Sequence, residues 1–427
     1  MKRSLSLILI LSALAIAISV VIKLTKVQYT NNEAASYLPI KTYIDGKNQV
    51  THPSAIDFDS TWNGYRYWLA YTPYPYGVGG EENPSLAVSN DLKVWDTPDG
   101  LYNPIANNEE VNCDELKDSH LVYRSDINRL EMWYMGRLNS TIKSGGDLLL
   151  FRKYSYDGIN WSEYEIMRTM NGTTSPSIIF EDGKYQLWSI VASQNNDTTN
   201  GQLLYAESSN GFEWNDYQSC TFGNDHHLSI WHGSVSKCDN NYHFVWIEDS
   251  GKSNVIKYAI SKDGVTFSSP EIVVKKAAGW KAFYRPHIIK NETGYNLFYG
   301  VITYENEWYI ALSFGKDIKS LIGYNEGIKQ QNNYYIRIIK NVIKSLNKYL
   351  RIELIILLLL ICITATVFIK KNLFSALWGI CWIISLAYCY YKYGIWDYMD
   401  CAYSLCSCGL ISLLCSAITL LFSRKEK

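Results

Sequence analysis

The chain has 427 residues, and its 40 lysines and arginines are balanced by 41 aspartates and glutamates, so the formal net charge at pH 7 is −1. Such a balance leaves no basic footprint for a nucleic-acid partner, and we expect none. Hydrophobic residues make up 47% of the sequence and gather at both ends. A globular domain tethered to a membrane is therefore the class that the composition favours.

Residues 1–26 form a predicted N-terminal membrane anchor. Lys2 and Arg3 precede an apolar run over residues 5–22, which is long enough to cross a bilayer as a helix. The run lacks a clear small-residue cleavage site. We therefore predict an uncleaved signal-anchor rather than a removed signal peptide.

A short phrase recurs through residues 46–324, with the pattern Ser-x-Asp/Asn-Gly-x-x-Trp/Phe in its clearest copies. Its copies begin 66, 53, 53 and 52 residues apart, and a period of this size indicates a repeat architecture. The Asp-Gly pair suits a tight hairpin in which glycine supplies the positive φ. The copies start at Ser89, Ser155, Ser208, Ser261 and, in decayed form, Ser313.

Each copy follows two apolar strands, of which the central one is rich in aromatic residues, as in residues 65–71 and 185–188. β-Branched and aromatic residues in alternation are the signal of a strand. Each unit is therefore predicted to be a four-stranded antiparallel sheet, and five units an all-β, five-bladed β-propeller. A β-sandwich or a β-helix is the alternative, but the units are too regular for the first and too long for the second.

The innermost strand of each blade lines the central channel, and its first residues point to one opening. Four of the seven histidines fall in these five strand starts. Side chains two positions apart share a face of a strand, so His52 with Ser54, and Asp118 with His120, are expected to face the channel. Aromatic faces pack against sugar rings while polar groups fix their orientation. The predicted sugar-binding residues are His52, His120, Trp231, His232, Tyr284, Arg285 and His287.

Two carboxylates are candidates for catalysis, Asp118 and Glu82. Glu82 lies in a predicted channel-side loop of blade 1, and general acid work would require burial and neighbours to raise the pKa of one of the two. The simpler alternatives are a hydrogen-bond acceptor at a strand start for Asp118 and a solvated loop charge for Glu82. The histidines come from different blades without a short ligand spacing, so we predict no metal site and no cofactor.

The five units, the Pro53-Ser54 start of the first inner strand and the repeated phrase together resemble the five-bladed glycoside hydrolases. These are the arabinanase and xylosidase group and the related levansucrase and invertase group. The resemblance covers residues 50–324. It implies an Asp that opens blade 1, a second Asp in blade 2 and a Glu in blade 3, with a channel His and an Arg in later blades.

The sequence departs from this pattern at the acid and base. His52 stands where the first Asp is expected, and His120 stands at the second, with Asp118 two residues earlier. Blade 3 offers Thr174 and Ser175 in place of the Glu, whereas His232 and Arg285 match the later blades in type. The scaffold thus resembles a glycosidase whose usual catalytic carboxylates are not in place.

The C-terminal part is predicted to be membrane-bound. Residues 333–350 read as a basic amphipathic helix on a membrane surface, and residues 351–427 as three transmembrane helices. Basic residues before the first span and at the ends of the last three place the propeller on the extracytoplasmic side of a multi-pass protein. The basic helix argues for the opposite orientation, because such segments prefer the cytoplasmic surface.

The sequence therefore predicts a membrane-anchored, glycoside hydrolase-like propeller that binds or cleaves a cell-surface or exported polysaccharide. It leaves open whether the protein is an enzyme, either a glycoside hydrolase or a transglycosidase. The alternatives are a non-catalytic carbohydrate-binding or polysaccharide-assembly protein, and a scaffold for protein partners in the envelope. Expected partners are a polysaccharide, the lipid bilayer and membrane proteins that contact the C-terminal helices.

Overall fold

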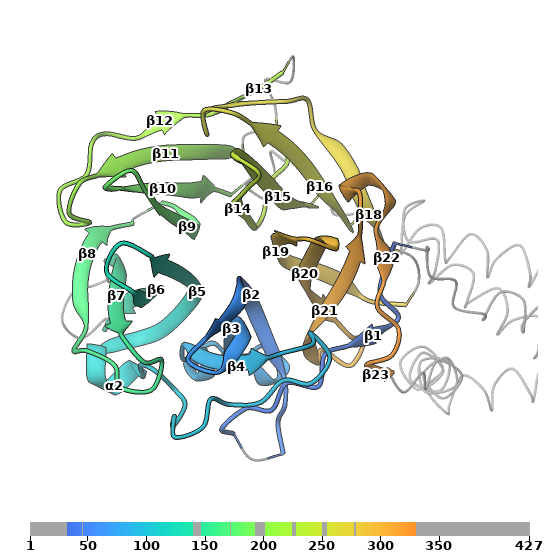
Figure 1. The fold of residues 1–427 in the computed structure, drawn as a ribbon, viewed down its shortest axis with the longest axis horizontal. Coiled ribbons are helices and arrows are strands. Elements are labelled where there is room, and N and C mark those ends of the chain that lie inside the picture. The colour runs from blue at the N-terminus through green and yellow to red at the C-terminus, as the bar shows by residue number, and fades with distance from the viewer. Residues whose placement is uncertain are drawn as a thin grey trace, which may run out of the picture. The chain divides into compact units, whose positions relative to one another are not determined.

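A computed structural model describes residues 32–44, 46–139, 147–170, 172–192, 201–223, 228–249, 254–276 and 279–329. They form a five-bladed β-propeller, which confirms the predicted all-β fold (Figure 1). The segments predicted to be membrane-bound, residues 1–26, 333–350 and 351–427, lie outside the described residues. Within the described part of the chain, no helix is long and apolar enough to span a membrane.

In blades 1, 2, 3 and 5 the strands follow one another from the central axis outward. A two-stranded sheet, a short helix and three 3₁₀ turns complete the described elements. The strands are, in blade 1, β2 (Val50–Trp62), β3 (Tyr65–Pro73) and β4 (Ser85–Ser89); in blade 2, β5 (Cys113–Arg124), β6 (Arg129–Leu138), β7 (Leu148–Ser155) and β8 (Glu165–Thr169); in blade 3, β9 (Thr174–Glu181), β10 (Lys184–Val191), β11 (Gln202–Ser208) and β12 (Gln218–Ser219); in blade 4, β13 (Thr221–Phe222), β14 (Gly233–Cys238), β15 (Asn241–Asp249), β16 (Asn254–Ser261), β17 (Thr266–Phe267) and β18 (Glu271–Lys275); in blade 5, β19 (Ala282–Asn291), β20 (Gly294–Ile302), β21 (Trp308–Gly315) and β22 (Ile322–Gly323). The remaining elements are β1 (Ser36–Tyr37), β23 (Ile328–Lys329), α2 (Asn108–Val111), η1 (Pro75–Gly77), η2 (Gly79–Glu81) and η3 (Ile318–Ser320).

Two blades differ from the predicted four-stranded sheet. Blade 1 has three strands, and a single bridge between Val88 and Asp96 stands in place of the fourth. Pro98 follows two residues later and has no N–H to continue the ladder, which explains why the pairing stops. The sheet of blade 4 has six strands, because β13 arrives from the preceding connection and pairs in parallel with β17.

The repeated phrase forms a loop at the end of the third strand, away from the starts of the inner strands. In blade 2 the Ser155 hydroxyl accepts from the N–H of Gly158 at 2.8 Å, and Asp157 Oδ1 accepts from the next two N–H groups. Gly158 has a φ of 78°, which confirms the predicted positive φ. A Cβ at Gly158 would lie 2.2 Å from the ring of Trp68 in blade 1. In blades 2, 3 and 4 the glycine of the phrase therefore packs against a tryptophan of the blade before it.

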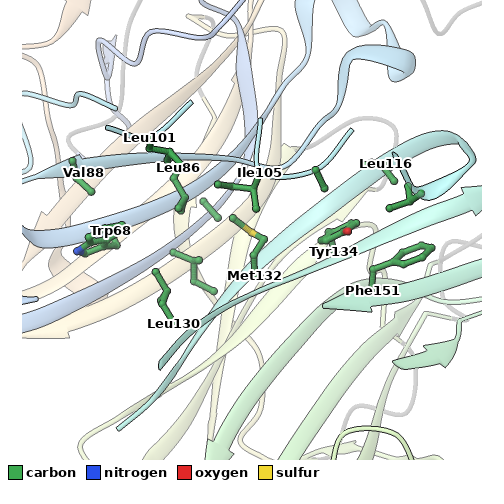
Figure 2. Packing of buried hydrophobic residues seen from close by; sticks show 14 of the residues in the cluster. Trp68, Leu86, Val88, Leu101, Ile105, Leu116, Leu130, Met132, Tyr134 and Phe151 are labelled. Carbon is green, nitrogen blue, oxygen red and sulfur yellow. The ribbon is translucent and has the colours of Figure 1, made fainter. Parts of the chain in front are cut away.

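The same contact recurs around the ring, since Gly264 of blade 4 lies against the buried ring of Trp188 in blade 3. Trp214, the last residue of the copy in blade 3, is only partly buried. Its ring lies 6.4 Å from that of Trp133 in blade 2, between centroids. Figure 2 shows the resulting cluster between blades 1 and 2, in which Trp68 and Met132 share one core.

An N-terminal segment closes the ring. Strand β1 pairs with β23, and Ala34 is held by two side chains of the last blades: the Ala34 N–H donates to the Tyr299 hydroxyl, and the Trp280 indole donates to the Ala34 carbonyl, both at 2.8 Å. Trp280 is fully buried. The segment thus joins the two ends of the propeller by specific hydrogen bonds as well as by the short sheet.

Candidate functional site

The inner strands have an unusual backbone near the start of β2 and β9 and in the middle of β5. His52, Asp118 and Ser175 have φ values of 54°, 55° and 52°, although none is a glycine. Each such residue costs about 1–3 kcal/mol and persists only where the surrounding structure imposes it. The strain recurs at matching positions in three successive blades, so it directs three side chains to one point on the axis.

Asp118 lies at that point and has no exposed surface. Its Oδ1 accepts from Arg285 Nη1 at 2.9 Å, and its Oδ2 accepts from the Thr174 hydroxyl at 2.8 Å and from the N–H of Ser175 at 3.1 Å. Burial alone would raise the pKa of Asp118, but Arg285 and the neighbouring histidines hold it well below its usual range. Asp118 is therefore ionised and enclosed, and both of its oxygens accept hydrogen bonds from protein groups.

His52 lies between two carboxyl groups. Its Nε2 is 3.4 Å from Asp118 Oδ1, and its Nδ1 is 3.5 Å from Glu82 Oε1. The backbone N–H of Asp118 donates to Nδ1 at 3.4 Å, and the Thr72 hydroxyl is 2.9 Å from the same atom. Nδ1 is therefore an acceptor, and the ring proton is on Nε2, which lies beside Asp118 but makes no hydrogen bond within the described residues. Burial lowers the pKa of His52 to about 3, despite the opposing effect of Asp118, so the ring is neutral.

Glu82 comes from the predicted channel-side loop, directly after η2, and is nearly buried. Burial raises its pKa well above the usual range, and the negative charges of Asp118 and Glu115 add to this, while Lys117 opposes it. A protonated Glu82 also fits its position beside Nδ1 of His52, which accepts a proton rather than offering one. Burial thus shifts the pKa of Glu82 upward, whereas Arg285 shifts that of Asp118 downward, and such opposite shifts are typical of acid and base pairs.

The second histidine of the mouth is His232. Its Nδ1 is 2.6 Å from the Ser175 hydroxyl, and its Nε2 is 2.9 Å from the Tyr284 hydroxyl. Burial lowers the pKa of His232 to about 4 and raises that of Tyr284 well above its usual value. Both groups are therefore neutral. Trp231 precedes this pair and is 37% exposed, so it belongs to the rim of the mouth.

His120 and His287 form a second layer below these groups. In each, Nε2 donates to a backbone carbonyl at 3.1 Å, and Nδ1 is 3.3 Å from the hydroxyl of Ser54 or Ser234, respectively. Both rings are buried with all polar atoms satisfied, so they fill the channel and brace neighbouring blades. Arg285 also has no exposed surface, and its Nη2 donates to the carbonyl of Pro176 at 2.8 Å.

Sequence reasoning missed Trp308, at the start of β21. Its ring centroid is 4.9 Å from that of Tyr284 and 4.6 Å from that of Tyr74, with both pairs in edge contact. The hydrogen bonds of the Thr72 and Ser175 hydroxyls with His52 and His232 were also not predicted. The signal that identifies Ser175 is its place at the start of the third inner strand, whereas a distant aromatic residue such as Trp308 has no local signal.

The mouth therefore presents neutral hydrogen-bonding groups, His52, His232, Tyr284 and a protonated Glu82, above an enclosed ion pair. These groups can exchange protons with a bound molecule and bind its polar atoms. Within the described residues, no group of three or more His, Cys, Asp or Glu side chains is arranged to hold a metal ion.

No protein-family model matches the chain. The sequence is 26% identical over 288 residues to the A type blood N-acetyl-α-D-galactosamine deacetylase of Flavonifractor plautii, a match that covers 55% of this chain and 37% of that protein. This chain thus spans little more than a third of its relative's length.

Solved structures share the fold. An N-acetylgalactosamine deacetylase from F. plautii, in complex with blood group B trisaccharide, has a TM-score of 0.56 at 21% identity over 66% of this chain and 94% of that chain. A thermostable family-43 glycoside hydrolase has a TM-score of 0.50 at 14% identity over 69% of this chain and 98% of that chain. The expected likeness to the five-bladed glycoside hydrolase scaffold is confirmed.

Proposed function

We propose that this protein acts on a carbohydrate bound at the channel mouth and that it hydrolyses the acetamido group of an N-acetylated amino sugar. The observation that carries the proposal is the chemistry of the mouth, where neutral polar groups lie beside a carboxylate that is paired with Arg285 and has no exposed surface. The similarity in sequence to an N-acetyl-α-D-galactosamine deacetylase supports the same reaction.

Cleavage of a glycosidic bond is the competing function, and it places different demands on the site. It normally requires two carboxyl groups about 5–10 Å apart that flank the sugar, one of them open to the anomeric carbon or to a water. Both oxygens of Asp118 are occupied by protein donors. In our proposal Asp118 is therefore a positioning residue that orients His52, and Glu82 is the carboxyl group that exchanges a proton with the ligand.

Hydrolysis of the amide adds water to the carbonyl carbon, breaks the C–N bond and releases acetate and the amine. The reaction needs a hydrogen-bond donor for the oxygen that gains negative charge and a group that transfers protons to the nitrogen. Tyr284 keeps its proton because burial raises its pKa, so its hydroxyl is suited to the first role. Glu82, whose pKa is raised in the same way, is suited to the second.

The test uses the full chain with oligosaccharides that end in N-acetylgalactosamine or N-acetylglucosamine. We expect acetate and free amines to appear without new reducing ends. New reducing ends without acetate would establish a glycoside hydrolase instead, and binding without either product would support the non-catalytic alternative. Glu82→Gln should lose turnover but keep binding, whereas the matched variant Glu81→Gln, in the same loop but more exposed, should keep both.

We also propose that apolar segments at both ends anchor the protein in a membrane, with the propeller on the extracytoplasmic side. The basis is the pattern of apolar runs and basic flanks in the sequence. The protein should stay in the membrane fraction after an alkaline wash. Tyr102 is 91% exposed, so Tyr102→Cys should react with an impermeant thiol reagent in intact cells. Labelling only after lysis would overturn the orientation.

A further inference from the structure

An exposed tyrosine beside the mouth is held in a strained conformation. Tyr76, in η1, has a φ of 54° and is 57% exposed. The left-handed region is unfavourable for a side chain with a Cβ, and glycine is the usual residue there. An exposed ring regains little of this free energy through burial, so the protein displays an aromatic face at the expense of stability.

A single buried glutamine fixes this loop to the neighbouring blade. Gln49 Oε1 accepts from the N–H of Tyr76 at 2.8 Å and from the N–H of Trp308 at 3.1 Å. The backbone carbonyl of Gln49 accepts from the N–H of Tyr74 at 2.9 Å. Gln49 therefore positions three aromatic residues that come from blades 1 and 5. We call Tyr74, Tyr76 and Trp308 the aromatic shelf.

The aromatic shelf continues from the site. The Trp308 ring contacts both Tyr74 and Tyr284, at centroid distances of 4.6 and 4.9 Å, and the Tyr284 hydroxyl is 2.9 Å from His232 Nε2. A Cβ at Gly77, next to Tyr76, would lie 3.7 Å from the Trp308 indole nitrogen. Aromatic rings thus extend outward from the polar groups of the mouth through Trp308 to Tyr74, and Tyr76 follows two residues later in the same loop.

We propose that the aromatic shelf is a second sugar-binding subsite, which stacks against the sugar unit attached to the one in the mouth. A sugar ring has an apolar C–H face that packs on aromatic rings, and its hydroxyls suit the polar groups beside them. The protein therefore takes an oligosaccharide rather than a single sugar. This inference rests on the proposed binding of carbohydrate at the mouth, but not on the proposed reaction.

The decisive variant is Tyr76→Gly, because glycine suits the local backbone and the change does not endanger folding. Binding is measured by calorimetry with the full chain in the Glu82→Gln background, which prevents turnover. The probes are N-acetylgalactosamine and a trisaccharide that ends in it. We expect Tyr76→Gly to weaken binding of the trisaccharide about tenfold, about 1.4 kcal/mol, and to leave binding of the monosaccharide unchanged.

Two further variants make the test specific. Trp308→Ala should weaken trisaccharide binding in the same direction. Tyr156 is also 57% exposed but lies in a repeated-phrase loop at the opposite end of blade 2, so Tyr156→Ala should change neither affinity. The inference fails if Tyr76→Gly binds the trisaccharide normally or loses both ligands equally. It also fails if the parent binds the trisaccharide no more tightly than the monosaccharide. If wild type releases no acetate while the selective loss persists, the proposed reaction fails and the subsite stands.

Discussion

Removal of the Arg285 guanidinium should destabilise the whole propeller, because this group compensates a charge at its centre. Arg285 and Asp118 have no exposed surface and are joined by a hydrogen bond of 2.9 Å. Loss of one partner of a buried ion pair costs about 3–5 kcal/mol, and the carbonyl of Pro176 loses a donor worth about 1 kcal/mol. We therefore expect Arg285→Met to lower the free energy of unfolding by about 3–6 kcal/mol at neutral pH.

The stability that Arg285→Met loses relative to wild type should depend on the charge of Asp118. The folded-state pKa of Asp118 is depressed, so its contribution to stability is present above the unfolded value of about 4 and is lost as the pH falls through the depressed folded-state pKa. Without Arg285, the effect of burial prevails and raises the pKa of Asp118 above its unfolded value, so the folded variant takes up a proton as the pH falls. The difference between Arg285→Met and wild type should therefore shrink between about pH 7 and about pH 4. The double variant Arg285→Met/Asp118→Asn should be more stable than Arg285→Met at neutral pH.

Urea unfolding, followed by tryptophan fluorescence at both pH values, measures these differences. Equal stability of the single and double variants at neutral pH, or a deficit that does not change with pH, would refute the electrostatic reasoning. Arg285→Lys keeps the charge, but an ammonium cannot reproduce both hydrogen bonds of the guanidinium. We therefore expect Arg285→Lys to have a stability between those of wild type and Arg285→Met.

The packing of the blades and the neutral histidines lead to two more predictions. Gly264→Ala should lower the free energy of unfolding by about 2–5 kcal/mol, because the added Cβ would lie 2.7 Å from the Trp188 ring. The control is Gly183→Ala, where the glycine has the same φ of 77° but open space around it. This change should cost only about 1–2 kcal/mol, as measured by urea unfolding. Burial lowers the pKa of His52 to about 3 and of His232 to about 4, so their contribution to stability is complete above about 6.5 and declines as the pH falls toward these values. An unfolding midpoint that stays constant from neutral pH to about pH 4 would contradict the second prediction.

The sequence was sufficient for the number of blades and for their central strands, because the repeated phrase and the aromatic runs are local signals. The outer edges were less predictable. A single proline, Pro98, ends the pairing that would complete blade 1, and β13 adds to blade 4 through two residues only. Such short pairings depend on where the preceding connection passes, which no local pattern encodes.

Sequence reasoning brought the correct strand starts together but did not predict their layers. The alternation rule placed His52 and Ser54 on one face, and Asp118 and His120 likewise. In the structure the register of β2 breaks between Thr51 and Ser54, and that of β5 between Lys117 and His120. The positive φ of His52 and Asp118 places these two side chains in the layer at the mouth. Ser54 and His120 meet in the lower one.

The proposed reaction and glycosidic cleavage place opposite demands on the distribution of charge at the mouth. Glycosidic cleavage passes through an oxocarbenium-like state with positive charge, which an open carboxylate stabilises. Amide hydrolysis passes through a tetrahedral state with negative charge on oxygen, which hydrogen-bond donors stabilise. Here the ionised carboxylate of Asp118 is paired with Arg285 and enclosed, while the groups nearer the mouth are neutral. An enclosed ion pair contributes little field at the mouth, so the site offers more to a developing oxyanion than to a developing cation, and this favours acetamido hydrolysis.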